Sequence, residues 1–133
     1  DALVPEAAKL LADADLTGAD LRGASLVGSD LTGAILAKAD LRGAILHDVS
    51  LDHVDLSAAR LRHTHLAALD LSGVLGLADA IHLGPSTVGV DTLHRTVEGL
   101  SLAPGNLGAV KTFLSRCGRN SDTCRCFEVL LHQ

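Results

Sequence analysis

Leucine returns at every fifth position through much of the first half of the chain, and a small residue usually stands two positions before it. The leucine position is filled in twelve consecutive units. These leucines are Leu16, Leu21, Leu26, Leu31, Leu36, Leu41, Leu46, Leu51, Leu56, Leu61, Leu66 and Leu71. Aspartate directly precedes the leucine in six units, and glycine follows it by two residues in six. Such strict repetition outweighs any local helix or strand preference.

A period of five fits neither regular element by itself. Successive side chains of a strand point to opposite faces, so alternate leucines would lie on opposite sides. In a helix each leucine would be rotated by about 140° from the last and the set would scatter around the axis. The period fits a short straight piece followed by a corner, where glycine relaxes the backbone. Four corners close a square, so we expect a square coil of four units with the leucines inside.

The units "ADLTG", "ADLRG" and "SDLTG" resemble the pentapeptide-repeat family, whose pattern is A(D/N)LXX. The resemblance covers about residues 14–73. It implies a mainly β fold, a right-handed quadrilateral β-helix with four units per coil. Twelve units then make about three coils, and strands about 4.8 Å apart give a column about 15 Å tall.

The ends of such a column need caps, because an open coil exposes unpaired backbone and apolar side chains. Pro5 and Glu6 suit the start of a short helix over residues 5–12. After Leu71 the five-residue register fails. We therefore divide the chain into an N-terminal capping helix (1–13), a pentapeptide-repeat β-helix (14–75) and a C-terminal helical unit (76–133).

Three helices are predicted in the C-terminal unit. The first covers about residues 90–98. The second begins at a capping Asn106 and carries an apolar stripe to Cys117. The third begins with Ser121 or Asp122 as its cap. This unit is expected to pack on the far end of the column.

The tail carries a second resemblance, in "GPSTVGVDTL" followed by "FLSRCGRNSD". Similar segments follow pentapeptide repeats in some bacterial multidomain proteins, often before a toll/interleukin-receptor-type domain. The usual pattern near the cysteine is closer to FLRGCGVP, whereas Ser115 and Arg116 stand here in place of Arg-Gly, and Arg119 and Asn120 in place of Val-Pro. The resemblance implies a regulatory or assembly part of a larger immune effector, with no effector domain in these residues.

Stacking by twenty residues places outward side chains in ladders. One wall is predicted to carry the candidate partner-binding arginines Arg22, Arg42, Arg60 and Arg62. Two interpretations stay open. The ladder binds an acidic partner or phosphates, or it is a solvated face that the neighbouring Asp20 and Asp40 neutralise.

Histidines and cysteines raise the question of a metal. The later coils carry four histidines: His47, His53, His63 and His65. Cys117, Cys124, Cys126 and His132 form C-x6-C-x-C-x5-H, which is not a common zinc spacing. Zinc ligation, a disulfide and ordinary thiols all stay open for the cysteines. We predict neither a metal site nor a cofactor.

Composition and the absence of known motifs narrow the classes of function that the chain can have. The formal charge of −5 weakly disfavours nucleic acid as a partner. No apolar run reaches the length of a membrane span. No signal peptide is visible, and an odd number of cysteines indicates a reducing, cytoplasmic location. No phosphate loop, nucleophile elbow or HExxH motif is present, and Asp91, His94 and Arg95 read as surface residues, so we predict no enzyme and no small-molecule substrate.

Two functions follow from this reading. The first is a non-enzymatic scaffold that binds a protein partner or a second copy of itself. The alternative is a DNA mimic, because the family resemblance brings in acidic β-helices that engage DNA gyrase. A short column and a wall of arginines count against the mimic, which needs continuous negative charge.

Overall fold

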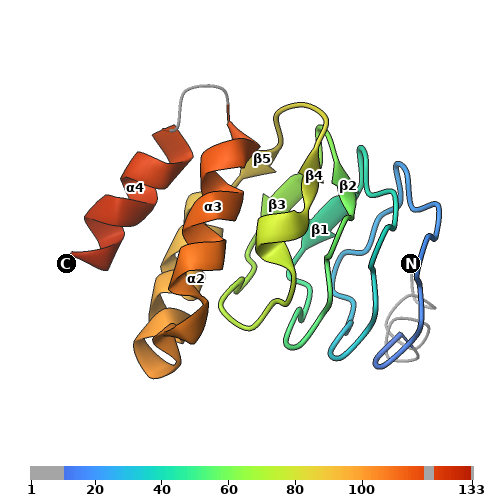
Figure 1. The fold of residues 1–133 in the computed structure, drawn as a ribbon, viewed down its shortest axis with the longest axis horizontal. Coiled ribbons are helices and arrows are strands. Elements are labelled where there is room, and N and C mark those ends of the chain that lie inside the picture. The colour runs from blue at the N-terminus through green and yellow to red at the C-terminus, as the bar shows by residue number, and fades with distance from the viewer. Residues whose placement is uncertain (1–10, 119–121, 133) are drawn as a thin grey trace.

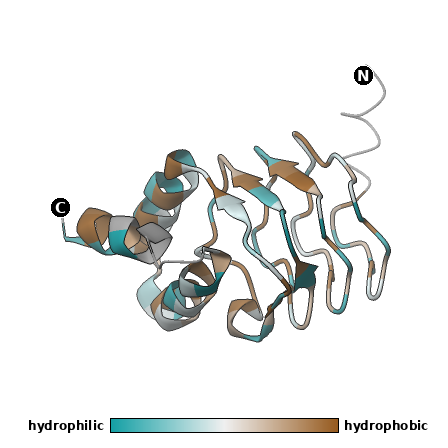
Figure 2. Cartoon of the chain, turned by 90° about the horizontal axis from the view of Figure 1, so that it is seen from above, coloured by the Kyte–Doolittle hydropathy of each residue, from teal (hydrophilic) through white to brown (hydrophobic). Residues whose placement is uncertain are grey.

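The computed structural model describes residues 11–118 and 122–132. Two parts follow one another along the long axis of the molecule (Figure 1). Stacked coils form a column, and helices cover the end of it that comes later in the chain (Figure 2). Of the capping helix expected over residues 5–12, only residues 11 and 12 are described, and they form a turn.

Parallel bridges between residues twenty apart join each coil to the next. The bridges form four ladders, so each coil has four walls. The ladders run through Asp15–Ile35–Asp55–Leu75, Asp20–Asp40–Arg60, Ser25–Ile45 and Asp30–Ser50. Strands β1 (Ile45–His47), β2 (Arg60–Leu61) and β3 (His65–Ala67) lie in the later coils, and β1 pairs with β3 in parallel. This agrees with the square coil that the five-residue period predicts.

The corners of the column hold one residue each in the left-handed region of backbone space, two positions after the leucine. Glycine fills five of these corners, with φ near 70°. The other seven carry a side chain: Asp13, Lys38, Asp48, His53, Ala58, His63 and Ala68. A left-handed conformation costs a residue with a Cβ roughly 1–2 kcal/mol, which explains why glycine recurs at this phase.

The interior of the column is the leucine layer that the sequence predicts. From Leu26 onward each leucine of the series is at most 9% exposed, while Leu16 and Leu21 in the first coil are only partly buried. The small residues two positions earlier fill the remaining space. Thr64 is fully buried at such a position, and its hydroxyl donates a hydrogen bond to the Leu41 carbonyl at 2.8 Å.

The column extends beyond the boundary that the sequence pattern suggests. Residues 76–89, assigned above to a helical unit, contain a 3-10 turn (Leu77–Asp79) and the strands β4 (Ile81–His82) and β5 (Thr87–Val88). Strand β4 pairs with β2, and β5 pairs with β3, both in parallel. Ladder hydrogen bonds use only the backbone, so a wall continues after the leucine period has ended.

Three helices complete the chain, at about the places predicted: α2 (Val90–Leu102), α3 (Leu107–Cys117) and α4 (Asp122–Leu131), with a 3-10 turn (Pro104–Asn106) before α3. Their buried faces join the leucine core, and Phe113 and Phe127 are at most 1% exposed. Asn106 was expected to cap α3, but its side chain makes no capping bond. Its amide instead donates to the Ser72 and Val74 carbonyls at 3.1 and 2.8 Å, tying the helices to the column.

Side chains of α2 take the place of a further rung on the last coil. The Leu69 and Leu71 amides donate to the hydroxyls of Thr92 and Thr96 at 3.2 and 3.0 Å. The Thr92 hydroxyl also donates to the Leu66 carbonyl at 2.9 Å. Both threonines are fully buried. The two hydroxyls therefore form the hydrogen bonds that backbone groups of a further coil would form.

Candidate interaction surface

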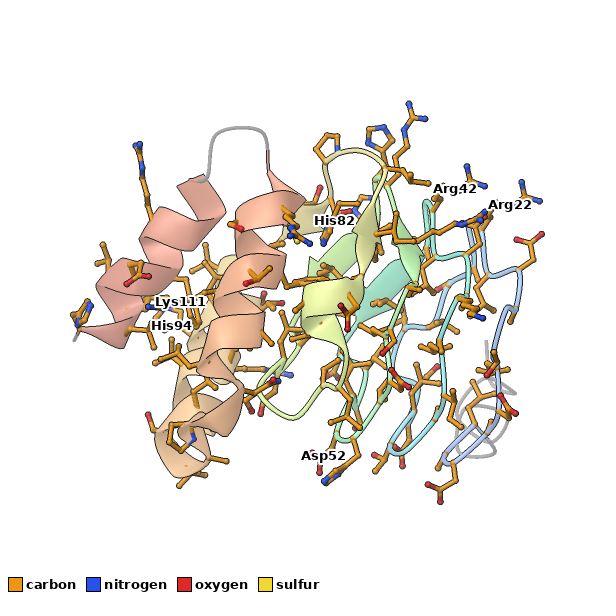
Figure 3. All side chains as sticks on the ribbon, in the orientation of Figure 1. Arg22, Arg42, Asp52, His82, His94 and Lys111 are labelled. Carbon is orange, nitrogen blue, oxygen red and sulfur yellow. The ribbon has the colours of Figure 1, made fainter. Side chains whose placement is uncertain are left out.

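The arginines predicted to form a ladder lie on one wall of the column. We call this surface the arginine wall: Asp20, Arg22, Asp40, Arg42, Arg60 and Arg62. Bridges join Asp20 to Asp40 and Asp40 to Arg60. The carbonyls of Arg42 and Arg62 accept hydrogen bonds from Gly23 and Gly43, which follow the arginine of the previous coil. The arginines thus stand one rung apart, and Figure 3 shows Arg22 and Arg42 on the same edge of the column.

Two of the four arginines are already paired. Arg22 binds Asp20 with both Nε and Nη2, at 2.9 and 2.8 Å. Arg42 binds Asp40 in the same bidentate way, at 2.8 and 2.6 Å. The hydrogen bond from Arg22 lowers the pKa of Asp20 to about 2, and Arg42 lowers the pKa of Asp40. This half of the wall is the self-neutralised face that the second interpretation describes.

Arg60 and Arg62 differ from the first pair. Within the described part of the chain, no carboxylate lies within ion-pair distance of either guanidinium, and both residues are exposed. Arg60 is bridged to Ile81 on the next rung, and Ile81 and Leu83 are 41% and 50% exposed. A Cβ added to Gly84 would lie 2.9 Å from Arg62 Cγ, so glycine leaves room for the arginine stem. The wall therefore ends in two free cations beside exposed apolar side chains.

The opposite wall carries the opposite charge. We call it the acidic wall: Asp30, Ser50, Asp52, Asp70 and Ser72. It belongs to the ladder that begins at Asp30, two walls around the coil from the one that begins at Asp20. Thr32 donates side-chain and backbone hydrogen bonds to Asp30 and lowers its pKa. Figure 3 places Asp52 on the edge of the column opposite Arg22 and Arg42.

A break in the ladder opens the acidic wall. In the earlier coils an amide donates to a carbonyl nineteen residues later, as Gly33 does to Asp52, but His53 donates to Gly73, twenty later. The pairing of His53 is therefore displaced by one residue, and the usual spacing returns where Leu56 donates to Leu75. Among the described residues, the amides of Leu51 and Asp70 and the carbonyls of Val49 and Asp70 have no hydrogen-bond partner. Sequence reasoning missed this break, because the leucine period runs through it unchanged.

A cavity of about 350 Å³ lies at the break. Residues 48–52 line one side, with Ala68, Asp70 and Gly73 on the other. Arg95 of α2 closes one end, where its Nη1 donates to the Ala68 carbonyl at 2.6 Å and to Asp48 at 3.2 Å. The cavity thus presents carboxylates together with free backbone carbonyls.

The histidines of the later coils do not come together with other metal ligands. His47, His53, His63 and His65 are all exposed. His53 Nδ1 lies 3.4 Å from Asp52, and no group of three metal-ligating side chains forms within residues 11–118 and 122–132. The histidines therefore contribute to the polar surface of the described structure.

Cys117 is fully buried in α3, and burial raises the pKa of its thiol to about 12. A thiol held protonated in this way packs as a small apolar side chain. His132, the proposed fourth ligand, lies 3.7 Å from Glu128. The side chains of Cys124 and Cys126 lie outside the described structure.

The residues of "DTLHRT" serve the join between helix and column. Asp91 accepts hydrogen bonds from the Ala68 and Thr92 amides, and these bonds lower its pKa. Arg95 reaches Ala68, as described above. Asp91 and Arg95 were expected to be plain surface residues, and their binding to the backbone of the last coil could be seen only once α2 was placed beside it.

A family model and several solved structures match parts of this chain. Residues 10–48 match the family described as pentapeptide repeats, with eight copies. HetL, a pentapeptide repeat protein involved in heterocyst differentiation regulation from the cyanobacterium Nostoc sp. strain PCC 7120, is 35% identical, with a TM-score of 0.44 over 58% of this chain and 37% of HetL. A pentapeptide repeat protein from the Arabidopsis thaliana thylakoid lumen is 28% identical, with a TM-score of 0.40 over 68% of this chain and 72% of that protein.

This chain thus spans a little over a third of the HetL structure. No curated protein matches the sequence. In the described residues, no helix has the length and apolar character needed to cross a membrane. Residues 10–48 thus carry pentapeptide repeats, and the four-walled column that they begin is a β-helix.

Proposed function

We propose that this chain is a non-enzymatic protein-interaction module and that the arginine wall is its contact surface. The observation that carries the proposal is the free pair Arg60 and Arg62, beside the exposed Ile81 and Leu83. Guanidinium groups without an internal partner are available to carboxylates of another protein, and apolar neighbours add buried area to the contact. The partner class is an acidic protein surface.

The module would serve as a regulatory or assembly part of a larger protein. The tail resemblance to segments before toll/interleukin-receptor-type domains supports this reading. In such a protein the column would bind the partner, and the chemistry would reside in another domain. A cytoplasmic location fits this role and remains part of the proposal.

The arginine wall also favours this function over DNA mimicry. A DNA mimic needs negative charge around its contact surface, whereas this wall carries four arginines against two aspartates. A gyrase supercoiling assay separates the two functions. Inhibition at about micromolar protein would support the mimic, and full supercoiling activity would remove it.

Binding of a fluorescein-labelled octaglutamate peptide tests the proposal directly. The change Arg60→Gln/Arg62→Gln should weaken binding about tenfold, because two exposed charge pairs are lost. The matched control Arg22→Gln/Arg42→Gln removes the same charge from the same wall but replaces arginines that are already paired, so its effect should be smaller. Equal effects of the two variants, or no binding by the wild type at low salt, would reject the free pair as the contact site.

A further inference from the structure

The arginine wall and the acidic wall lie on opposite sides of one column (Figure 3). The first carries four arginines and two aspartates, and the second carries three aspartates. The chain as a whole has a formal charge of −5, so the arginine wall is a local exception. A molecule with opposite charge on opposite faces is complementary to a second copy of itself.

Each wall also presents groups that lack a partner. On the arginine wall, as far as residues 11–118 and 122–132 are concerned, these are the guanidinium groups of Arg60 and Arg62. On the acidic wall, within the described chain, they are the carbonyls of Val49 and Asp70, which line a cavity together with Asp52. Asp48, which also lines this cavity, already pairs with Arg95 at 3.2 Å. Guanidinium has only donors, whereas carbonyls and carboxylates are acceptors, so the two sets match in chemistry.

The two walls match in spacing as well. Both belong to the same stack of coils, so rungs on each wall repeat at about 4.8 Å, except where the acidic wall opens between Ser50 and Asp70. When two columns lie side by side with parallel axes, a row of arginines can therefore face a row of carboxylates rung by rung. An unrelated acidic surface would match this spacing only by chance.

We propose that the arginine wall of one copy docks on the acidic wall of a second copy, with Arg60 and Arg62 at the broken rung between Val49 and Asp70. This inference rests on the proposed function, since it names the partner of the same surface. The contact joins two different faces and is heterologous. Because the faces lie on opposite sides, each added copy leaves a free wall, and copies form an open row.

Sedimentation velocity on the full chain tests the inference. The average mass should rise continuously with concentration at about 50 mM salt and fall to that of the monomer at about 500 mM, because the contact is electrostatic. Arg60→Glu/Arg62→Glu should weaken association at least about tenfold, and Ser50→Lys/Asp52→Lys should do the same from the other wall. Circular dichroism on each variant verifies that the column is folded.

A mixture of the two charge-reversed variants gives the sharpest result. Each variant alone places like charges at the contact, whereas the mixture pairs unlike charges on both walls. We expect the mixture to associate while neither component does. Association that persists in both variants, or a mixture that remains monomeric, would overturn the inference.

The octaglutamate assay on the same proteins separates this inference from the proposed function. A wild type that stays monomeric at low salt but binds octaglutamate through Arg60 and Arg62 rejects the second copy as the partner and leaves the interaction module in place. A wild type that neither associates nor binds octaglutamate rejects both proposals.

Discussion

The repeat column and the helical end of this molecule satisfy the same backbone groups by different means. Inside the column, each coil bonds to the backbone of the next, as Leu41 does to Arg60 at 2.9 Å. At the end of the column, the hydroxyls of Thr92 and Thr96 accept hydrogen bonds from backbone amides instead. Arg95 donates a hydrogen bond to the Ala68 carbonyl. The last coil of a β-helix leaves backbone amides and carbonyls that could pair with another coil. Ending the helix therefore requires side chains that form those hydrogen bonds.

The column and the helical end also differ in the residue types that their positions require. A column position needs only a leucine, a small residue or a residue that tolerates a corner, so a five-residue unit is enough. An end position needs one particular donor or acceptor at one place, as Asn106 supplies to the Ser72 and Val74 carbonyls. Substitutions should therefore be tolerated differently in the two parts.

The largest effect is expected at the helical end, from Thr92→Val. This change removes a buried hydroxyl that bonds both the Leu69 amide and the Leu66 carbonyl. The Leu66 carbonyl keeps a hydrogen bond from the Gly89 amide, so only the Leu69 amide is left buried without a partner. This loss should lower the free energy of unfolding by about 2 kcal/mol, as measured in urea. Thr112→Val in α3 is the matched control, since its hydroxyl bonds only the Gly108 carbonyl of the same helix. An equal loss in both variants would show that α2 does not close the column.

A smaller effect is expected at the corners of the column. Gly23 has a φ of 68°, and an added Cβ would meet no atom within 4 Å, so Gly23→Ala should cost about 1 kcal/mol from backbone strain alone. Ala58 adopts a φ of 58°, so Ala58→Gly should instead stabilise by about 0.5–1 kcal/mol. Thermal unfolding measures both changes. Ala37→Gly, just outside a corner, should destabilise, and a gain there would contradict the explanation.

The smallest effect concerns pH and His82, where column and helices meet. Both ring nitrogens of His82 are buried without a partner among the described residues, and the ring packs on Phe113 with centroids 5.0 Å apart. Burial, with a smaller effect of Arg116, lowers the pKa of His82 below its ordinary 6.5. The folded state therefore binds this proton less well than the unfolded state, and stability should fall as pH drops below about 6.5.

Urea unfolding of His82→Leu at several pH values tests this expectation. The variant should lose less stability than the wild type between about pH 7 and pH 5. His94→Ala, which changes an exposed histidine of α2, should retain the wild-type dependence. A His82→Leu variant with an unchanged pH profile would count against the buried histidine as the cause.

Much of the column could be read from the leucines and glycines. A period of five excludes a plain helix or strand, and the corner glycines carry the positive φ that a square coil requires. The arginine wall followed from the same count of twenty. The ion pairing within the arginine wall could not be predicted from that count. Whether Arg22 or Arg60 contacts a carboxylate depends on the residue two positions earlier and on the side chains of adjacent rungs.

The repeat alone determined the coil, its inward leucines and the order of the walls, because these follow from local geometry that each unit repeats. Only the tertiary structure decided where the column stops, how Thr92 and Thr96 close it, and where the rung between Val49 and Asp70 opens. These features join residues far apart in the chain, and the free energy of such contacts depends on how whole coils and helices meet. A five-residue sequence pattern therefore does not predict these contacts.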